Sequence, residues 1–198
     1  MRHLLAALAA AIVTFFWGFL AWAAVDIWGF AFSSAPGEEE LLTAMSMSLP
    51  EEGTYYLPFM PEGFGSDPGD PEAAARDKDF EDRFRDGPTA LIFFRPKGGE
   101  VMDPMELLRG FGIEFVAALL LACSLSAVQG GFVRRVAVGI TIGIFAATAT
   151  WGVTGNFFRL PLPFVLASWA DVVIAWGLAA VVVAKILPSK VPAESAAA

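Results

Sequence analysis

Long apolar runs separated by shorter polar stretches dominate the pattern of this chain. Four runs, at 4–25, 111–128, 136–153 and 164–187, are apolar almost throughout. A helix needs roughly 20 residues to cross about 30 Å of hydrocarbon, and a helix satisfies its own backbone hydrogen bonds in lipid. The pattern therefore predicts a mainly α membrane protein with four transmembrane helices.

The first apolar run also has features of a secretory signal peptide. Arg2 precedes it, and Ala21-Trp22-Ala23 is similar to a cleavage site. The apolar region of a signal peptide spans only about 7–15 residues, whereas this run is longer and aromatic and continues through Trp28. We expect it to be retained as the first transmembrane helix, with cleavage as the alternative.

The polar segment 33–110, between the first two runs, has shorter patterns of its own. It predicts a helix at 38–49, a strand at 54–57, a helix at 71–86 and a strand at 89–94. A two-stranded sheet is marginally stable by itself. We therefore expect a small α+β cap that rests on the membrane helices or on a partner.

The distribution of charge predicts the orientation in the membrane. The chain has a net charge of −8, and segment 33–110, with 17 acidic and 7 basic residues, accounts for −10. Basic residues beside membrane spans favour the cytoplasmic side. Arg2 and the pair Arg134 and Arg135 therefore predict cytoplasmic termini and an extracytoplasmic acidic segment. Arg159 lies on the opposite side, where we expect it to anchor at the interface.

The predicted architecture is a four-transmembrane-helix bundle with the α+β cap inserted between helices 1 and 2. Its parts are transmembrane helix 1 at 1–32, the acidic extracytoplasmic segment at 33–110, transmembrane helices 2–4 at 111–188 and a flexible cytoplasmic tail at 189–198. The lipid bilayer is the first expected partner. A second copy of the chain or another membrane protein is the second.

Composition excludes several classes of function. The chain is 56% hydrophobic and 17% charged, which is more apolar than a typical soluble domain. Its pI of about 4.6 argues against a nucleic-acid partner, because phosphate binding needs clustered Lys and Arg. The single cysteine, Cys123, and the single histidine, His3, exclude a disulfide framework and a Cys/His zinc site. We expect no metal and no cofactor.

Three carboxylates in the outer halves of the predicted spans are the candidate site residues: Asp26, Glu114 and Asp171. Each lies on a stripe of small residues with i±4 spacing, and such stripes are typical contact faces between transmembrane helices. We therefore expect the three side chains to point into the bundle, where they can converge beneath the cap. Asn156 and Arg159 lie in the neighbouring outer turn.

Two interpretations of these acids remain open. Three acids in a low-dielectric site cannot all stay ionised without compensating charge or protons. In the first interpretation, Arg159 or Arg109 neutralises part of the cluster, which locks the helix packing. In the second, Asp26, Glu114 and Asp171 form an outward-opening site for a proton, a metal cation or a cationic solute.

Catalytic patterns are absent from the sequence. Neither Asp26 nor Asp171 lies in the Gly-x-Gly-Asp context of an intramembrane aspartyl protease. The serines of the spans lack a base, because His3 lies at the opposite, cytoplasmic end. We therefore expect a protein that is not an enzyme.

Several short motifs together resemble a known group of proteins. They are Trp17-Gly18, Gly53-x-Tyr55-Tyr56, Gly87-Pro88 leading into Leu91-Ile92-Phe93-Phe94-Arg95-Pro96, Met102 to Gly110 before the second span, and Asp171 with Trp176-Gly177. This arrangement is similar to a group of bacterial inner-membrane proteins of unknown function. The resemblance implies a bacterial origin and four spans, and it brings no activity.

The expected function is a non-enzymatic interaction or accessory protein of the inner membrane. The cap and the small-residue stripes would mediate association with itself or with another membrane protein. The alternative is a small protein that binds or translocates a cation, proton or solute through Asp26, Glu114 and Asp171.

Overall fold

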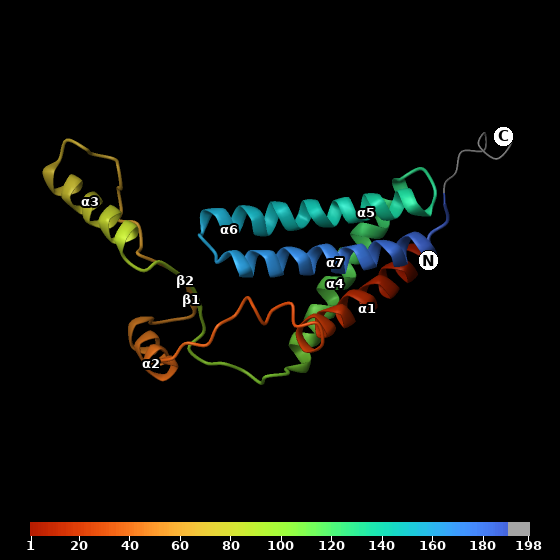
Figure 1. Ribbon diagram of the computed structural model, residues 1–198, viewed down its shortest axis with the longest axis horizontal. Helices are drawn as coiled ribbons and strands as arrows, with labels where there is room; N and C mark the ends of the chain where they lie inside the picture. Colours follow the sequence, from red (N-terminus) through yellow and green to blue (C-terminus); the bar gives the residue numbers. More distant parts are fainter. Residues whose placement is uncertain (190–198) are drawn as a thin grey trace. The chain divides into compact units, whose positions relative to one another are not determined.

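The computed structural model describes residues 1–189 and divides into two compact units (Figure 1). The helical unit comprises residues 1–34 and the chain from Glu100 onward, and the insert unit comprises Ala35–Gly99. The tail expected at 189–198 lies, apart from Ser189, outside the described residues.

Four helices of the described chain are long and apolar enough to cross a membrane. They are α1 (Arg2–Ala23), α4 (Pro104–Ala127), a continuous helix from Phe132 to Phe157, and α7 (Leu162–Ile186). They contain 22 to 26 residues each. At a rise of roughly 1.5 Å per residue they extend about 33–39 Å, which is sufficient for the hydrocarbon layer. The prediction of a mainly helical chain with four candidate spans is confirmed.

The third of these helices changes its winding near its C-terminal end. It consists of α5 (Phe132–Ala147), a π-helical turn η1 (Thr148–Gly152) and α6 (Val153–Phe157). Arg159 then adopts a positive φ of 53°, and the Leu160 N–H donates to the Gly155 carbonyl oxygen at 3.0 Å. This bonding pattern, with a left-handed residue just after the last turn, ends α6 before α7 begins.

Helix packing in the helical unit depends on small residues. Helix α7 packs against α5 and α1, and α1 also packs against α4; Figure 1 shows α7 running beside α5 and α6. The stripe Gly139, Gly143 and Ala147 of α5 is buried, as predicted from its spacing. A Cβ atom at Gly139 would collide with the Cβ of Ala180. Close approach of α5 and α7 therefore requires glycine at this position.

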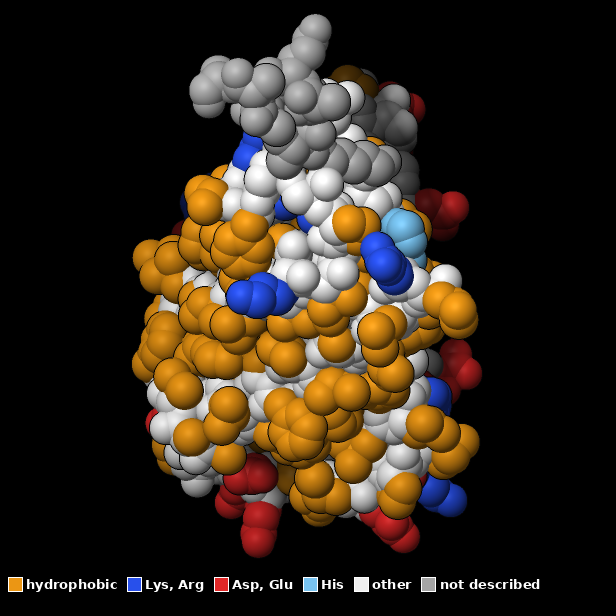
Figure 2. All heavy atoms as spheres, turned by 90° about the vertical axis from the view of Figure 1, so that its right-hand side faces the viewer, with side chains coloured by type: hydrophobic (Ala, Val, Ile, Leu, Met, Phe, Trp, Pro, Cys, Tyr) orange, Lys and Arg blue, Asp and Glu red, His pale blue; other side chains and the backbone are white. Residues whose placement is uncertain are grey.

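The outer faces of these helices carry the large apolar side chains. Phe16, Ile113 and Phe145 are 62%, 71% and 71% exposed, respectively. Apolar side chains cover most of the face that the helical unit turns to the viewer in Figure 2. Such a surface is unfavourable in water and suits contact with lipid.

The insert unit contains two helices and two strands. They are α2 (Glu38–Ser48), β1 (Gly53–Leu57), α3 (Pro71–Asp86) and β2 (Ala90–Phe94). The strands are antiparallel, with Gly53 opposite Phe94 and Leu57 opposite Ala90. All four elements lie within two residues of their predicted bounds. Asp70 is the clearest sequence signal for the beginning of α3. In the structure its side chain caps the helix by accepting a hydrogen bond from the Glu72 N–H at 3.1 Å.

The interior of the insert unit is small and aromatic. Its buried apolar residues are Ala73, Phe80 and Phe94. Phe80 packs edge-on against Phe64 with ring centroids 5.3 Å apart, and Phe84 packs near Tyr56 at 6.4 Å. These contacts attach one edge of α3 to the loop and strand β1, so the rest of α3 faces solvent.

Candidate functional site

Asp171 connects α7 to α1. Its Oδ1 accepts a hydrogen bond of 2.7 Å from the indole Nε1 of Trp17, and both residues are half-buried. A carboxylate at membrane depth is costly unless it faces a polar partner in the protein or water. The indole N–H supplies that partner. Asp171 therefore acts as a hydrogen-bonded contact between two helices that are distant in sequence.

The sequence pattern does not predict Trp17 as the partner of Asp171. The distribution of charge predicts compensation by basic residues, whereas the indole of tryptophan is a neutral N–H donor. Of the two bases considered, Arg109 is exposed and its Nε donates to the Met105 carbonyl oxygen of its own helix at 3.2 Å. The sequence feature that indicates this hydrogen bond is the donor side chain of Trp17 in the outer half of α1.

Glu114 is the second carboxylate, and its environment is apolar. It is half-buried on α4, and its Oε2 is buried without a hydrogen-bond partner. It lines a groove of about 660 Å³ between α1 and α4. The walls include Phe15, Gly18, Phe19 and Trp22 of α1 and Gly110 of α4.

Asp26, the third carboxylate, lies beyond the end of α1. Helix α1 ends at Ala23, and Asp26 follows in an exposed turn with a positive φ of 52°. Its carbonyl oxygen accepts from the Gly29 N–H at 3.2 Å. The expectation that Asp26 continues the α1 stripe into the bundle is wrong, because the helix stops before the row reaches it.

Asn156 and Arg159 are both exposed, at the end of α6 and in the turn that follows it.

Within residues 1–189, no group of three or more His, Cys, Asp or Glu side chains has the geometry to hold a metal ion. Asp26, Glu114 and Asp171 therefore do not meet in a shared site of that kind.

An aromatic cluster joins the end of α1 to α7. Trp22 stacks on Trp28 with centroids 5.3 Å apart, Phe32 contacts Phe164 at 5.8 Å, and Trp151 contacts Phe164 at 5.7 Å. Aromatic pairs of this kind add to the energy of burial. The chain that leaves α1 is thus packed on the beginning of α7.

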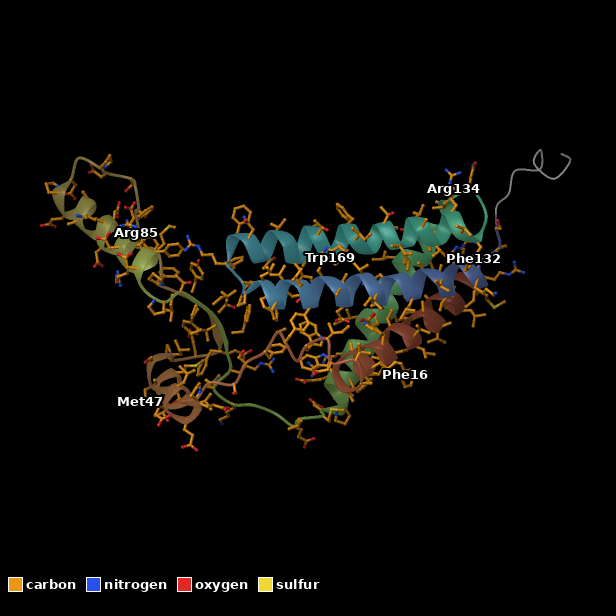
Figure 3. The ribbon with its side chains drawn as sticks, in the orientation of Figure 1. Phe16, Met47, Arg85, Phe132, Arg134 and Trp169 are labelled. Carbon is orange, nitrogen blue, oxygen red and sulfur yellow. The ribbon has the colours of Figure 1, made fainter. Side chains whose placement is uncertain are left out.

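Arg135 is a buried charge whose burial the sequence did not reveal. It is 1% exposed, and its Nη1 donates to the carbonyl oxygens of Leu187 at 2.9 Å and Pro188 at 3.3 Å. A cation is favourable at the C-terminal end of a helix, where carbonyl groups lack partners. The neighbouring Arg134 is exposed and points away from the helices (Figure 3). Arg135 therefore fixes the end of α7 to the beginning of α5.

The insert unit also exposes large apolar side chains. Met47, Phe59 and Phe93 are 82%, 78% and 77% exposed. The sheet has two strands, so each of them has an edge without a neighbouring strand in the described chain. Open strand edges and exposed aromatic side chains are features of protein-binding surfaces.

Comparisons of the chain with protein-family models, with curated proteins and with solved structures find no match. The class of protein therefore rests on the fold. Four helices long and apolar enough to span a membrane, within residues 1–189, indicate a multi-pass membrane protein. The bacterial origin, the inner membrane and the cytoplasmic termini stay predictions from the sequence.

Proposed function

We propose that this chain is a non-enzymatic interaction or accessory protein of the bacterial inner membrane. The helical unit anchors it with both termini in the cytoplasm. The insert unit, on the extracytoplasmic side, binds a protein partner, which is a second copy of the chain or another membrane protein.

The observation that carries this proposal is the exposure of large apolar side chains in the insert unit. Phe59 lies two residues after the end of β1 and Phe93 belongs to β2, and both expose more than three quarters of their surface. Three apolar residues are buried in the same unit. The insert unit thus has large apolar side chains outside its own core, and the surface of a partner would cover them.

Translocation of a cation or proton has less support. Such a path would require Asp26, Glu114 and Asp171 to lie together along the spans. Asp26 is exposed beyond the end of α1, and Asp171 is bonded to Trp17. We therefore do not propose transport as the function.

The test measures association of the full-length protein. The wild type, the double variant F59S/F93S and the control F16S are extracted from membranes into polymer-bounded lipid particles, and the mass of the protein complex is determined. Phe16 is an exposed phenylalanine of α1 and has the same chemistry in the helical unit.

The wild type and F16S are expected to form complexes larger than the 21.1 kDa chain. Burial of a phenylalanine contributes about 1.5–3 kcal/mol, so F59S/F93S should weaken association at least tenfold. A wild type that is a single chain, or an F59S/F93S variant with unchanged complexes, would refute the proposal.

A further inference from the structure

The groove between α1 and α4 combines apolar walls with one carboxylate. Its volume of about 660 Å³ lies in the range of small-molecule sites, which are mostly apolar with a few polar groups that fix orientation. Glu114 is the acidic residue among its lining residues. The Glu114 carboxylate is thus the charged group of the groove that can bind the polar part of a ligand.

The polar group of the groove lacks a partner in the protein. The Oε2 atom of Glu114 is buried and accepts no hydrogen bond. A buried carboxyl oxygen without a donor is unfavourable, and a charged donor compensates it best. A group that carries both N–H donors and positive charge would therefore be a suitable partner for the Glu114 carboxylate.

The aromatic walls of the groove also suit a positively charged group. Phe15, Phe19 and Trp22 line the groove on the α1 side. Aromatic faces attract cations, tryptophan most strongly. A groove lined by a carboxylate and three aromatic side chains is a suitable environment for an ammonium group.

The groove has space for an occupant because two of its wall residues are glycines. A Cβ atom added at Gly18 or at Gly110 would meet no atom within 4 Å. Both positions are therefore open, unlike Gly139 and Gly155, where a Cβ would collide with a side chain of α7.

The position of the groove indicates a lipid as its occupant. Residues beside it on the same helices, Phe16, Leu20 and Ile113, are between 52% and 71% exposed and apolar. Glu114 lies three residues after Phe111, where the apolar run of α4 begins, which is about 5 Å along the helix. The carboxylate is then close to the level of lipid head groups, and acyl chains are adjacent to the groove.

We propose that this groove binds a membrane lipid with a primary ammonium head group, such as an ethanolamine phospholipid. The ammonium donates a hydrogen bond to the Glu114 carboxylate and lies against the aromatic wall, and an acyl chain follows the apolar part of the groove. A choline head group lacks N–H donors and cannot form this hydrogen bond.

The test uses native mass spectrometry of the full-length protein released from detergent. Ethanolamine, choline and glycerol phospholipids with identical acyl chains are titrated separately, and bound lipid is counted. E114Q removes the charge, and E106Q changes an exposed glutamate of the same helix as its control. G110L fills the groove, and G112L is its control, because Gly112 is exposed on the same helix and also has open space around it.

The wild type is expected to retain ethanolamine lipid at least tenfold more tightly than choline lipid, as the loss of a charge-assisted hydrogen bond implies. E114Q should lose this preference, and G110L should lose binding of both lipids. E106Q and G112L should behave as the wild type. Helical circular dichroism and a single elution peak show that each variant is folded.

Equal retention of ethanolamine and choline lipids by the wild type would overturn the proposal without any variant. Preserved preference in E114Q would overturn it too. Free phosphoethanolamine should not displace the lipid at millimolar concentration. Displacement would show that a soluble amine is the ligand and that the assignment to a lipid is wrong.

Discussion

The indole Nε1 of Trp17 donates a hydrogen bond of 2.7 Å to Oδ1 of Asp171 and so joins α1 to α7 across 154 positions of sequence. Interhelical hydrogen bonds in membranes stabilise by about 0.6–2 kcal/mol. W17F removes the donor and keeps an aromatic ring, so it should lower the free energy of unfolding by about that amount.

A double-mutant cycle with W17F and D171A isolates this bond. The coupling energy, obtained from unfolding in mixed micelles monitored by circular dichroism, should be about 0.5–2 kcal/mol. Strictly additive effects of the two substitutions would show that the bond does not contribute to stability.

Close packing of α5 on α7 leads to a second prediction. A Cβ at Gly139 collides with Ala180, so G139A should lower the free energy of unfolding by about 1–3 kcal/mol through overpacking. The control G112A adds the same methyl group to an exposed, open position of α4. Thermal unfolding of both variants in the same detergent checks the difference. Equal stability of G139A and G112A would contradict the observed helix contact.

The buried Arg135 leads to a third prediction. R135M keeps an unbranched apolar stem but is shorter, and it leaves the carbonyl oxygens of Leu187 and Pro188 without their donor. We expect a loss of about 2 kcal/mol in stability. We also expect faster hydrogen exchange at the C-terminal end of α7. R134M changes the exposed neighbour and should alter neither quantity; an equal response of the two variants would contradict the structural role of Arg135.

Membrane orientation provides a fourth prediction. Cys123 is the single cysteine of the chain, so C123S gives a background for cysteine labelling. S48C, at the end of α2, should react with a membrane-impermeant maleimide in intact cells. Q129C, in the exposed turn after α4, should react after permeabilisation only. Labelling of Q129C in intact cells would contradict the orientation that the basic residues predict.

The elements of the chain were predictable because their ends carry local signals. Asp70 with Pro71 marks the beginning of α3, and Gly87 follows its last residue, so capping chemistry located this helix within the insert unit. The membrane spans follow from the length of the apolar runs. The buried stripe of α5 follows from glycine spacing, because small residues allow close approach of helices.

Side-chain partners were less predictable, since they depend on tertiary contacts. The row that placed Asp26 in the bundle assumed that α1 continues beyond Ala23, whereas the chain turns there. The donor to Asp171 is a neutral indole, which a search for opposite charges overlooks. Arg134 and Arg135 are identical and adjacent, and the rotation of α5 against α7 decides which one is buried.

The most direct test of the proposed function is photocrosslinking of the full-length protein in living cells through position 93. A photoreactive phenylalanine analogue replaces Phe93, and the control replaces Lys78, an exposed residue of α3 in the same unit. The analogue at position 93 should give one discrete protein adduct, which F59S should weaken, and position 78 should give none. Adducts of equal yield at both positions, or crosslinking to lipid alone at position 93, would contradict the conclusion that the insert unit binds a protein partner.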